Sequence, residues 1–95
     1  MIRVEIIGNR SIQEDLEEIL KKYKVGGYRT LIPEVHGTGS SGPRRGDHIW
    51  PEDNFIMIIY CKKDEAEKIR QAVMELKNFF KQEGIKMFTT KALDI

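Results

Sequence analysis

Hydrophobic and polar residues alternate at the start of the chain. In the segment IRVEIIG, which begins at Ile2, the polar residues Arg3 and Glu5 separate hydrophobic positions. A period of two is typical of a strand with one face buried and the other exposed. The pattern therefore predicts a first strand over residues 2–8.

The next segment has the period of a helix. Its hydrophobic residues fall on one helical face, and acidic and basic residues cover the other. The hydrophobic face consists of Ile12, Leu16, Ile19, Leu20 and Tyr23. Ser11 and Glu14 stand at the spacing of a capping box, which predicts the start of the helix. Gly26 and Gly27 are expected to end it.

A second helical pattern covers residues 64–83. Asp64 is expected to cap its first turn, and Gly84 is expected to end the helix. The stripe predicted to face the core consists of Ala66, Ile69, Val73, Leu76 and Phe80.

Three further segments are predicted to be strands. YRTLIPEV, residues 28–35, contains Pro33, which lacks a backbone N–H and so belongs at a sheet edge or a bulge. FIMIIYC, residues 55–61, is hydrophobic almost throughout, as expected of a central strand buried on both faces. IKMFTTKAL, residues 85–93, is expected to form the fourth strand.

The predicted order is strand, helix, strand, strand, helix, strand in a single domain over residues 1–95. Right-handed crossovers then place both helices on one face of a four-stranded antiparallel sheet, which is the α+β, ferredoxin-like βαββαβ sandwich. The other sheet face needs a cover, and Met57, Ile59 and Phe88 are the apolar candidates to line it. Self-association is the simplest cover, because a chain of 95 residues buries only about 60–65% of its unfolded surface.

Composition excludes several classes of protein. Sixteen basic and fifteen acidic residues give a formal net charge of +1, which argues against a general nucleic-acid or membrane-surface binder. No apolar run approaches the ~20 residues of a membrane span, and the start of the chain has no signal-peptide pattern, so we expect a cytoplasmic protein without membrane insertion. Cys61 is the only cysteine, which excludes an intramolecular disulfide and a cysteine-based zinc site.

A long segment separates the second and third predicted strands. EVHGTGSSGPRRGDHIWPEDN, residues 34–54, holds both histidines and the only tryptophan. Loops longer than ~12–15 residues are usually functional or disordered. Its glycines together with Arg44 and Arg45 can surround an anion, because backbone N–H groups and guanidinium forks both bind carboxylate or phosphate. A flexible solvated loop and a protein-docking loop anchored by Trp50 are the alternatives.

Metal binding and catalysis are two further possibilities for the same residues. His36 and His48 suit zinc or copper, but they lack the spacing of a helix-borne pair, so a site would need residues from two subunits. No Ser-His-Asp or Cys-His set is indicated by spacing, and we therefore expect no enzyme activity. The strands also lack the aromatic pattern of RNA-binding proteins of this fold.

The entry to the long loop resembles the PII signal-transduction family, the nitrogen-regulatory proteins. In that family the second strand commonly ends in a Glu-Val-x-Gly-x-Gly pattern, which Glu34, Val35, Gly37 and Gly39 match. The loop that follows would correspond to the family's T-loop, residues 37–54.

A second match lies at the start of the last predicted strand. The family has a Gly-Lys-Ile-Phe type segment there, and Lys86 and Phe88 match its lysine and phenylalanine, with the glycine displaced to Gly84. The family's glycine-rich phosphate loop is replaced by residues 78–83, which contain no glycine. The resemblance is therefore to a divergent, PII-like member.

The resemblance implies a regulatory homotrimer that binds ADP, ATP or a small anion and docks its loop onto a transporter or an enzyme. The residues expected to contact the ligand are Gly37, Gly39, Arg44, Arg45 and Lys86. Trp50 is expected to contact the partner. Because the phosphate loop is missing, we expect weak adenine-nucleotide binding or a preference for a smaller anion. The alternative is a trimeric metal-binding protein similar to the divalent-cation tolerance proteins, with His36 and His48 as ligands.

Overall fold

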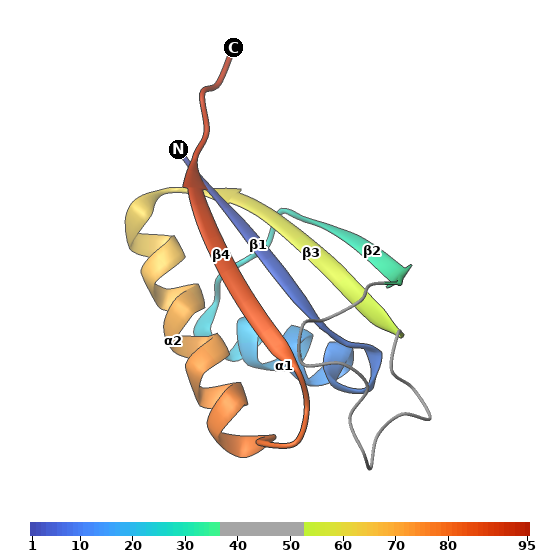
Figure 1. Cartoon of the computed structure of the whole chain (residues 1–95). Coiled ribbons are helices and arrows are strands. Elements are labelled where there is room, and N and C mark those ends of the chain that lie inside the picture. Colours follow the sequence, from blue (N-terminus) through green and yellow to red (C-terminus); the bar gives the residue numbers. More distant parts are fainter. Residues whose placement is uncertain (37–52) are drawn as a thin grey trace.

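A computed structural model describes residues 1–36 and 53–95 of the chain. In this part of the chain four strands form one antiparallel sheet in the order β2-β3-β1-β4 (Figure 1). The strands are β1 Ile2–Asn9, β2 Arg29–Val35, β3 Asn54–Cys61 and β4 Ile85–Lys91. The helices are the short 3-10 helix η1 Arg10–Ile12 and the α-helices α1 Gln13–Tyr23 and α2 Lys63–Phe79. This is the predicted ferredoxin-like α+β fold.

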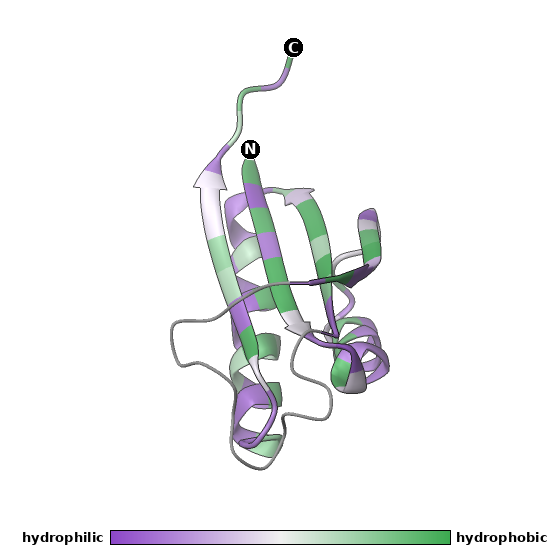
Figure 2. Cartoon of the chain, turned by 45° about the vertical axis from the view of Figure 1, so that its right-hand side comes forward, coloured by the Kyte–Doolittle hydropathy of each residue, from purple (hydrophilic) through white to green (hydrophobic). Residues whose placement is uncertain are grey.

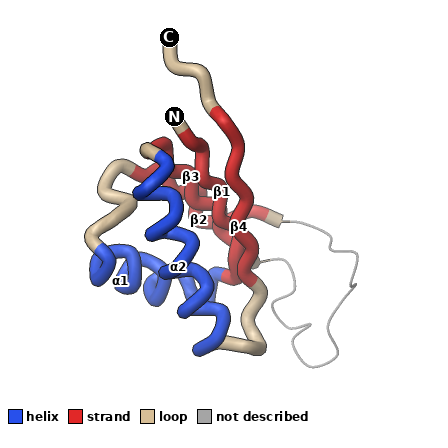
Figure 3. Tube along the Cα trace, turned by 90° about the vertical axis from the view of Figure 1, so that its left-hand side faces the viewer, coloured by secondary structure: helices blue, strands red, loops and turns tan. Residues whose placement is uncertain are grey.

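Both α-helices lie on the same face of the sheet (Figure 3). The side chains between the two layers form one buried core, in which Ile6, Leu16 and Ile69 are completely inaccessible to solvent. Burying a side chain of this kind contributes roughly 1.5–3 kcal/mol. The alternation predicted for β1 is confirmed: Val4 and Ile6 face the helices, and hydrophobic and hydrophilic bands alternate along the strand (Figure 2).

The predicted capping box at the start of α1 is wrong. Ser11 lies within η1, and α1 begins after Ile12 without a side-chain cap. The Ser11 hydroxyl instead donates a hydrogen bond of 2.7 Å to Oε1 of Glu83, which is 72 residues away in the sequence. A long-range contact has therefore replaced the local one.

The predicted ends of both helices also need correction. α1 ends at Tyr23, and Lys24 takes the left-handed conformation (φ 58°) expected of a glycine at the C-terminal cap. Gly26 lies two residues farther on, also at positive φ (70°). α2 ends at Phe79, before Gly84.

The start of α2 carries no side-chain cap. Asp64 is not the cap, because the N-terminal cap position is Lys62. Asp64 and Glu65 lie in the first turn, where negative charge is favourable next to the helix N-terminus. Electrostatic attraction to the helix dipole thus takes the place of the predicted hydrogen bond.

β2 is an edge strand, as Pro33 predicts. Its pairing with β3 shifts register between Ile32 and Val35, on either side of the proline. β3 is an inner strand and begins at Asn54. Asn54, which was predicted as the last residue of the 37–54 loop, therefore belongs to the strand. Cys61 ends β3 as a buried thiol in the core.

The face of the sheet turned away from the helices was only partly predicted. Met57 and Ile59 do not line it, because both are buried under the helices. Phe88 does lie on it and is 54% exposed. β3 is apolar on both sides, so its composition alone did not indicate which residues faced the core.

Candidate functional site

Charged residues gather where the long loop leaves and rejoins the sheet. Arg10 lies between the two ends: its backbone N–H donates to the carbonyl of Asp53 at 2.9 Å, and its guanidinium lies 3.7 Å from a carboxylate oxygen of Glu34. The second carboxylate oxygen of Glu34 lies 3.8 Å from Nε2 of His36. We call Arg10, Glu34, His36 and Asp53 the loop-base cluster. It holds residues 36 and 53, the last described residues on either side of the segment 37–52, next to the start of η1.

The same end of the sheet is connected to the turn between α2 and β4. Oε1 of Glu83 accepts hydrogen bonds from Nδ2 of Asn9 at 3.2 Å and from Oγ of Ser11 at 2.7 Å. The backbone N–H of Asn9 donates to the carbonyl of Gly84 at 3.0 Å. Residues 9–11 therefore contact both the turn before β4 and, through Arg10, the loop-base cluster.

Lys86 is the predicted ligand contact that the structure describes. It lies on β4 two residues after Gly84, is exposed, and is paired in register with Ile7 of β1. Ile7 stands two residues before Asn9, so Lys86 lies at the end of the sheet that carries the loop-base cluster.

The other predicted contacts lie outside the described residues. These are Gly37, Gly39, Arg44 and Arg45 for the ligand, Trp50 for the partner, and His48 for the alternative metal site. Their roles remain predictions, and the structure does not test whether they approach Lys86.

The metal alternative depends on histidines near carboxylates. His36 lies beside Glu34 in the loop-base cluster. Across residues 1–36 and 53–95, no three His, Cys, Asp or Glu side chains are close enough together to hold a metal ion. The His36 and His48 alternative thus stays a prediction that depends on a residue outside this part of the chain.

Among the described residues, several apolar side chains are exposed on the sheet face turned away from the helices. Its strands are in register, so that side chains form rows across the sheet. We call this surface the open face; it consists of Arg3, Glu5, Ile7, Thr30, Ile32, Ile56, Ile58, Tyr60, Lys86, Phe88 and Thr90. Ile32, Tyr60 and Phe88 are 38%, 55% and 54% exposed. Half-buried isoleucines lie between them, and apolar side chains exposed together on one face are typical of interaction surfaces.

An ion pair lies near the middle of the open face, on the inner strand β1. Nη1 of Arg3 is 2.8 Å from Oε1 of Glu5, and their side chains are only 33% and 28% exposed. The Tyr60 hydroxyl beside Arg3, and then the Glu5 carboxylate, hold the pKa of Arg3 above its ordinary value. Both neighbours therefore favour the charged form of the guanidinium.

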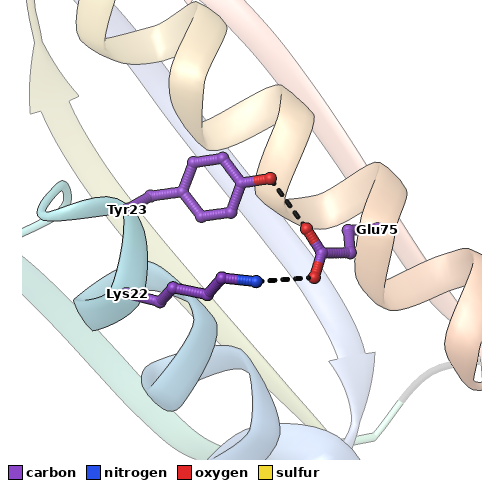
Figure 4. A network of polar contacts seen from close by, with 3 residues as sticks. All are labelled: Lys22, Tyr23 and Glu75. Atoms are coloured by element: carbon purple, nitrogen blue, oxygen red, sulfur yellow. Dashed lines mark hydrogen bonds and ion pairs between the residues drawn. The ribbon is translucent and has the colours of Figure 1, made fainter.

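A second polar network joins the two helices on the outer surface (Figure 4). Glu75 of α2 accepts a hydrogen bond of 2.7 Å from the Tyr23 hydroxyl and one of 3.2 Å from the Lys22 ammonium of α1. The Tyr23 bond, followed by the Lys22 bond, lowers the pKa of Glu75. The Glu75 carboxylate in turn raises the pKa of Tyr23. This network links α1 to α2 and lies in the helical layer, on the opposite side of the sheet from the open face.

Sequence reasoning missed the Arg3–Glu5 pair as a feature of a surface. It used both residues only as the polar half of the alternation in β1. The available signal was the alternation of side chains along a strand: Arg3 and Glu5 are two residues apart, so they share the face opposite to the buried Val4 and Ile6. Glu83 was missed for another reason: its partners are more than 70 residues away in the sequence.

Several solved structures share the fold of this chain. A PII-like signalling protein from Thermus thermophilus is 24% identical, with a TM-score of 0.65 over 94% of this chain and 83% of its own. CPII from Thiomonas intermedia, a nitrogen regulatory PII-like protein solved with ADP and bicarbonate, is 18% identical, with a TM-score of 0.67 over 94% of this chain and 82% of its own. Another CPII structure contains ADP, AMP and bicarbonate; it is 20% identical, with a TM-score of 0.66 over 93% of this chain and 86% of its own.

No curated protein matches the chain significantly. Neither of the described α-helices is long and apolar enough to span a bilayer. The model of the family described as nitrogen regulatory protein P-II matches residues 1–95. The chain therefore belongs to the nitrogen regulatory protein P-II family.

Proposed function

We propose that the chain is a homotrimeric PII-like regulator, one domain over residues 1–95, that binds a small anionic ligand and controls a partner protein. The observation that carries the proposal is the open face, on which Ile32, Tyr60 and Phe88 are exposed in the single chain. The protein acts in the cytoplasm by changing the activity of its partner, without a reaction of its own.

Assembly follows from the area that the open face exposes. Ile32 is more than one third exposed, and Tyr60 and Phe88 are each just over half exposed. Covering three such side chains contributes on the order of 1 kcal/mol each, with further gain from the half-buried isoleucines of β1 and β3. Every subunit in a ring contributes this surface. The total free energy gained by burying its apolar side chains can therefore exceed the several kcal/mol that association costs in lost translational and rotational freedom.

The ligand that fits best is a short anion. The two CPII structures named above contain ADP and bicarbonate, and one of them also contains AMP. In this chain the turn before β4 has no glycine between Asn78 and Glu83, and Glu83 uses the hydrogen-bond donors of Asn9 and Ser11. Few donors therefore remain there for a long phosphate chain, and we propose bicarbonate, AMP or ADP ahead of ATP.

Positive charge for this ligand comes from Lys86 and from the segment between β2 and β3. Lys86 lies exposed at the same end of the sheet as the loop-base cluster, which marks where that segment begins and ends. Gly37, Gly39, Arg44 and Arg45 of the segment would supply backbone N–H groups and guanidinium forks.

Signal output uses the same segment. Trp50 would anchor it on a transporter or an enzyme, because tryptophan is favoured at the centre of protein interfaces. Ligand binding next to the loop-base cluster would change which loop conformations are populated, and so the affinity for the partner.

Two measurements test the proposal. Sedimentation velocity at micromolar concentration is expected to give a trimer, and a stable monomer would contradict the assembly. Calorimetry with bicarbonate, AMP, ADP and ATP is expected to give measurable binding, with ATP weakest among the nucleotides. Binding of none of these ligands would contradict the proposed anion sensor.

Lys86→Ala tests the location of the site. Loss of one charge-assisted hydrogen bond costs about 1.5–3 kcal/mol, so the affinity is expected to fall by roughly 10- to 100-fold. Lys91→Ala is the matched control, because Lys91 is an exposed lysine at the opposite end of the same strand. Equal binding by both variants would show that the ligand lies elsewhere.

A further inference from the structure

The open face carries an ion pair where an apolar surface would be expected. Arg3 and Glu5 pair at 2.8 Å on the inner strand β1, with Tyr60 beside the guanidinium. Ile58 and Phe88 lie directly across from Glu5 on the neighbouring strands. Among the ion pairs between described residues, this is the one on the open face.

Covering this face removes water from both charges. The side chains of Arg3 and Glu5 are already about two thirds buried in the single chain. An ion pair that loses its remaining water is stabilised only if new hydrogen bonds or charges replace it; otherwise the desolvation penalty can exceed the attraction within the pair. A purely apolar partner offers no such replacement.

A second copy of the chain does offer one. Each copy brings one cation and one anion, so the pair is neutral and complementary to itself. In a closed ring of identical subunits, Arg3 of one copy can meet Glu5 of the next, and every guanidinium then lies between two carboxylates. The charges alternate around the ring, and no charge is left unpaired.

We propose that the Arg3–Glu5 pair makes the open face selective for copies of this same chain. The inference rests on the proposed homotrimer and adds how the subunits recognise one another. The isoleucines, Tyr60 and Phe88 supply the affinity, while the charges exclude apolar surfaces and chains whose charges stand in another order. Unpaired or like charges at an interface are a recognised source of such discrimination.

An interchange of the two charges tests the selectivity. The double variant R3E/E5R keeps the same groups on the same strand but reverses their order. The matched control is the double variant E67R/R70E, which interchanges an ion pair of the same residue types on the outside of α2, 3.3 Å apart. Each variant is unfolded and refolded together with a mass-tagged wild-type chain, and subunit composition is measured by native mass spectrometry.

The expected result is that R3E/E5R forms trimers with itself and not with the wild type. Mixed rings would place like charges side by side, so they should be depleted at least about tenfold against statistical mixing, a difference of ~1.4 kcal/mol. E67R/R70E should mix with the wild type in statistical proportions. The single variant R3E, which leaves two acids side by side, should dissociate at markedly higher concentration than the wild type.

Several results would overturn the inference. These are statistical mixing of R3E/E5R with the wild type, wild-type assembly by R3E alone, and failure of R3E/E5R to assemble while the control assembles. Circular dichroism of each chain separates loss of assembly from loss of folding. The variant E5Q keeps the shape of the side chain without its charge and should form weaker trimers when subunit composition is measured by native mass spectrometry. A wild-type monomer would instead remove the homotrimer itself, before any mixing is measured.

Discussion

Gly26 and Gly27 are neighbours in the sequence, yet substitution by alanine should have opposite effects at the two positions. Gly26 has φ 70°, and a Cβ there would lie 3.3 Å from Cδ1 of Ile59 and 3.4 Å from Cδ1 of Leu20. A Cβ on Gly27 would meet nothing within 4 Å. Gly26 also donates its N–H to Oε2 of Glu65 at 2.8 Å, which joins the turn after α1 to α2.

The comparison isolates the strain in the folded state. Either substitution restricts the unfolded chain and so stabilises by about 0.4–1 kcal/mol where the native backbone tolerates it. At Gly26 the left-handed conformation costs an alanine roughly 1–2 kcal/mol, and the tight contact with Ile59 adds to this cost. Since the unfolded-state gain is common to both variants, Gly26→Ala should be less stable than Gly27→Ala by about 1–2 kcal/mol.

Thermal unfolding followed by circular dichroism measures this difference. All three proteins are compared at one concentration, because the proposed assembly would make the midpoint concentration-dependent. For a chain of this size, 1–2 kcal/mol corresponds to a difference in Tm of roughly 5–15 °C. Gly27→Ala should unfold at or slightly above the temperature of the wild type. Equal Tm values for the two variants would refute the assigned backbone conformation of this turn.

Three further predictions concern the helix network and the thiol. The pKa of Glu75 is lower in the folded than in the unfolded state, so its carboxylate stabilises the fold above the unfolded pKa. This stability is lost as the pH falls through the folded pKa. Urea titrations at several pH values should therefore show that Glu75→Gln removes this part of the pH dependence on the acid side. The raised pKa of Tyr23 has the opposite sign, so its contribution is lost at alkaline pH, and Tyr23→Phe should flatten that side. Cys61 is 5% exposed and burial raises its pKa, so a thiol reagent should label it only after unfolding, at a rate that follows the fraction unfolded.

Each of these has a result that would contradict it. Unchanged acid-side dependence in Glu75→Gln would show that other carboxyls set the pH dependence. If the alkaline limb of Tyr23→Phe matches that of the wild type, the Tyr23–Glu75 bond does not persist in solution. Rapid labelling of Cys61 in the folded protein would mean that the end of β3 opens locally.

The sequence predicted the architecture well because the fold depends on periodicity. The alternation in β1 and the hydrophobic faces of the two helices are properties of neighbouring residues, and they suffice for element order and layer arrangement. β3 was harder, since its hydrophobic residues lie on both sides. Only the register, which pairs Met57 with the buried Ile6, shows which side faces the helices.

Helix ends and the candidate site depended on contacts that a local pattern does not contain. Ser11 has the right spacing for a cap, but its hydroxyl is bound to Glu83 from the far end of the chain. Lys24 adopts a conformation that propensity assigns to glycine. For the site, a family motif indicated Lys86, which lies at the same end of the sheet as the loop-base cluster but on the edge strand opposite β2. The residues of the open face, including its ion pair, are identified only when the alternation of side chains along each strand is combined with the pairing register between strands.

The outer edge of β2 bears on the tendency of the chain to aggregate. An edge strand presents unpaired backbone groups on which another strand can be added, and repeated addition leads to fibres. β2 interrupts this edge with Pro33, which has no N–H to donate, and with the shift in register between Ile32 and Val35. The β2 edge is thereby made a poor template for the addition of further strands.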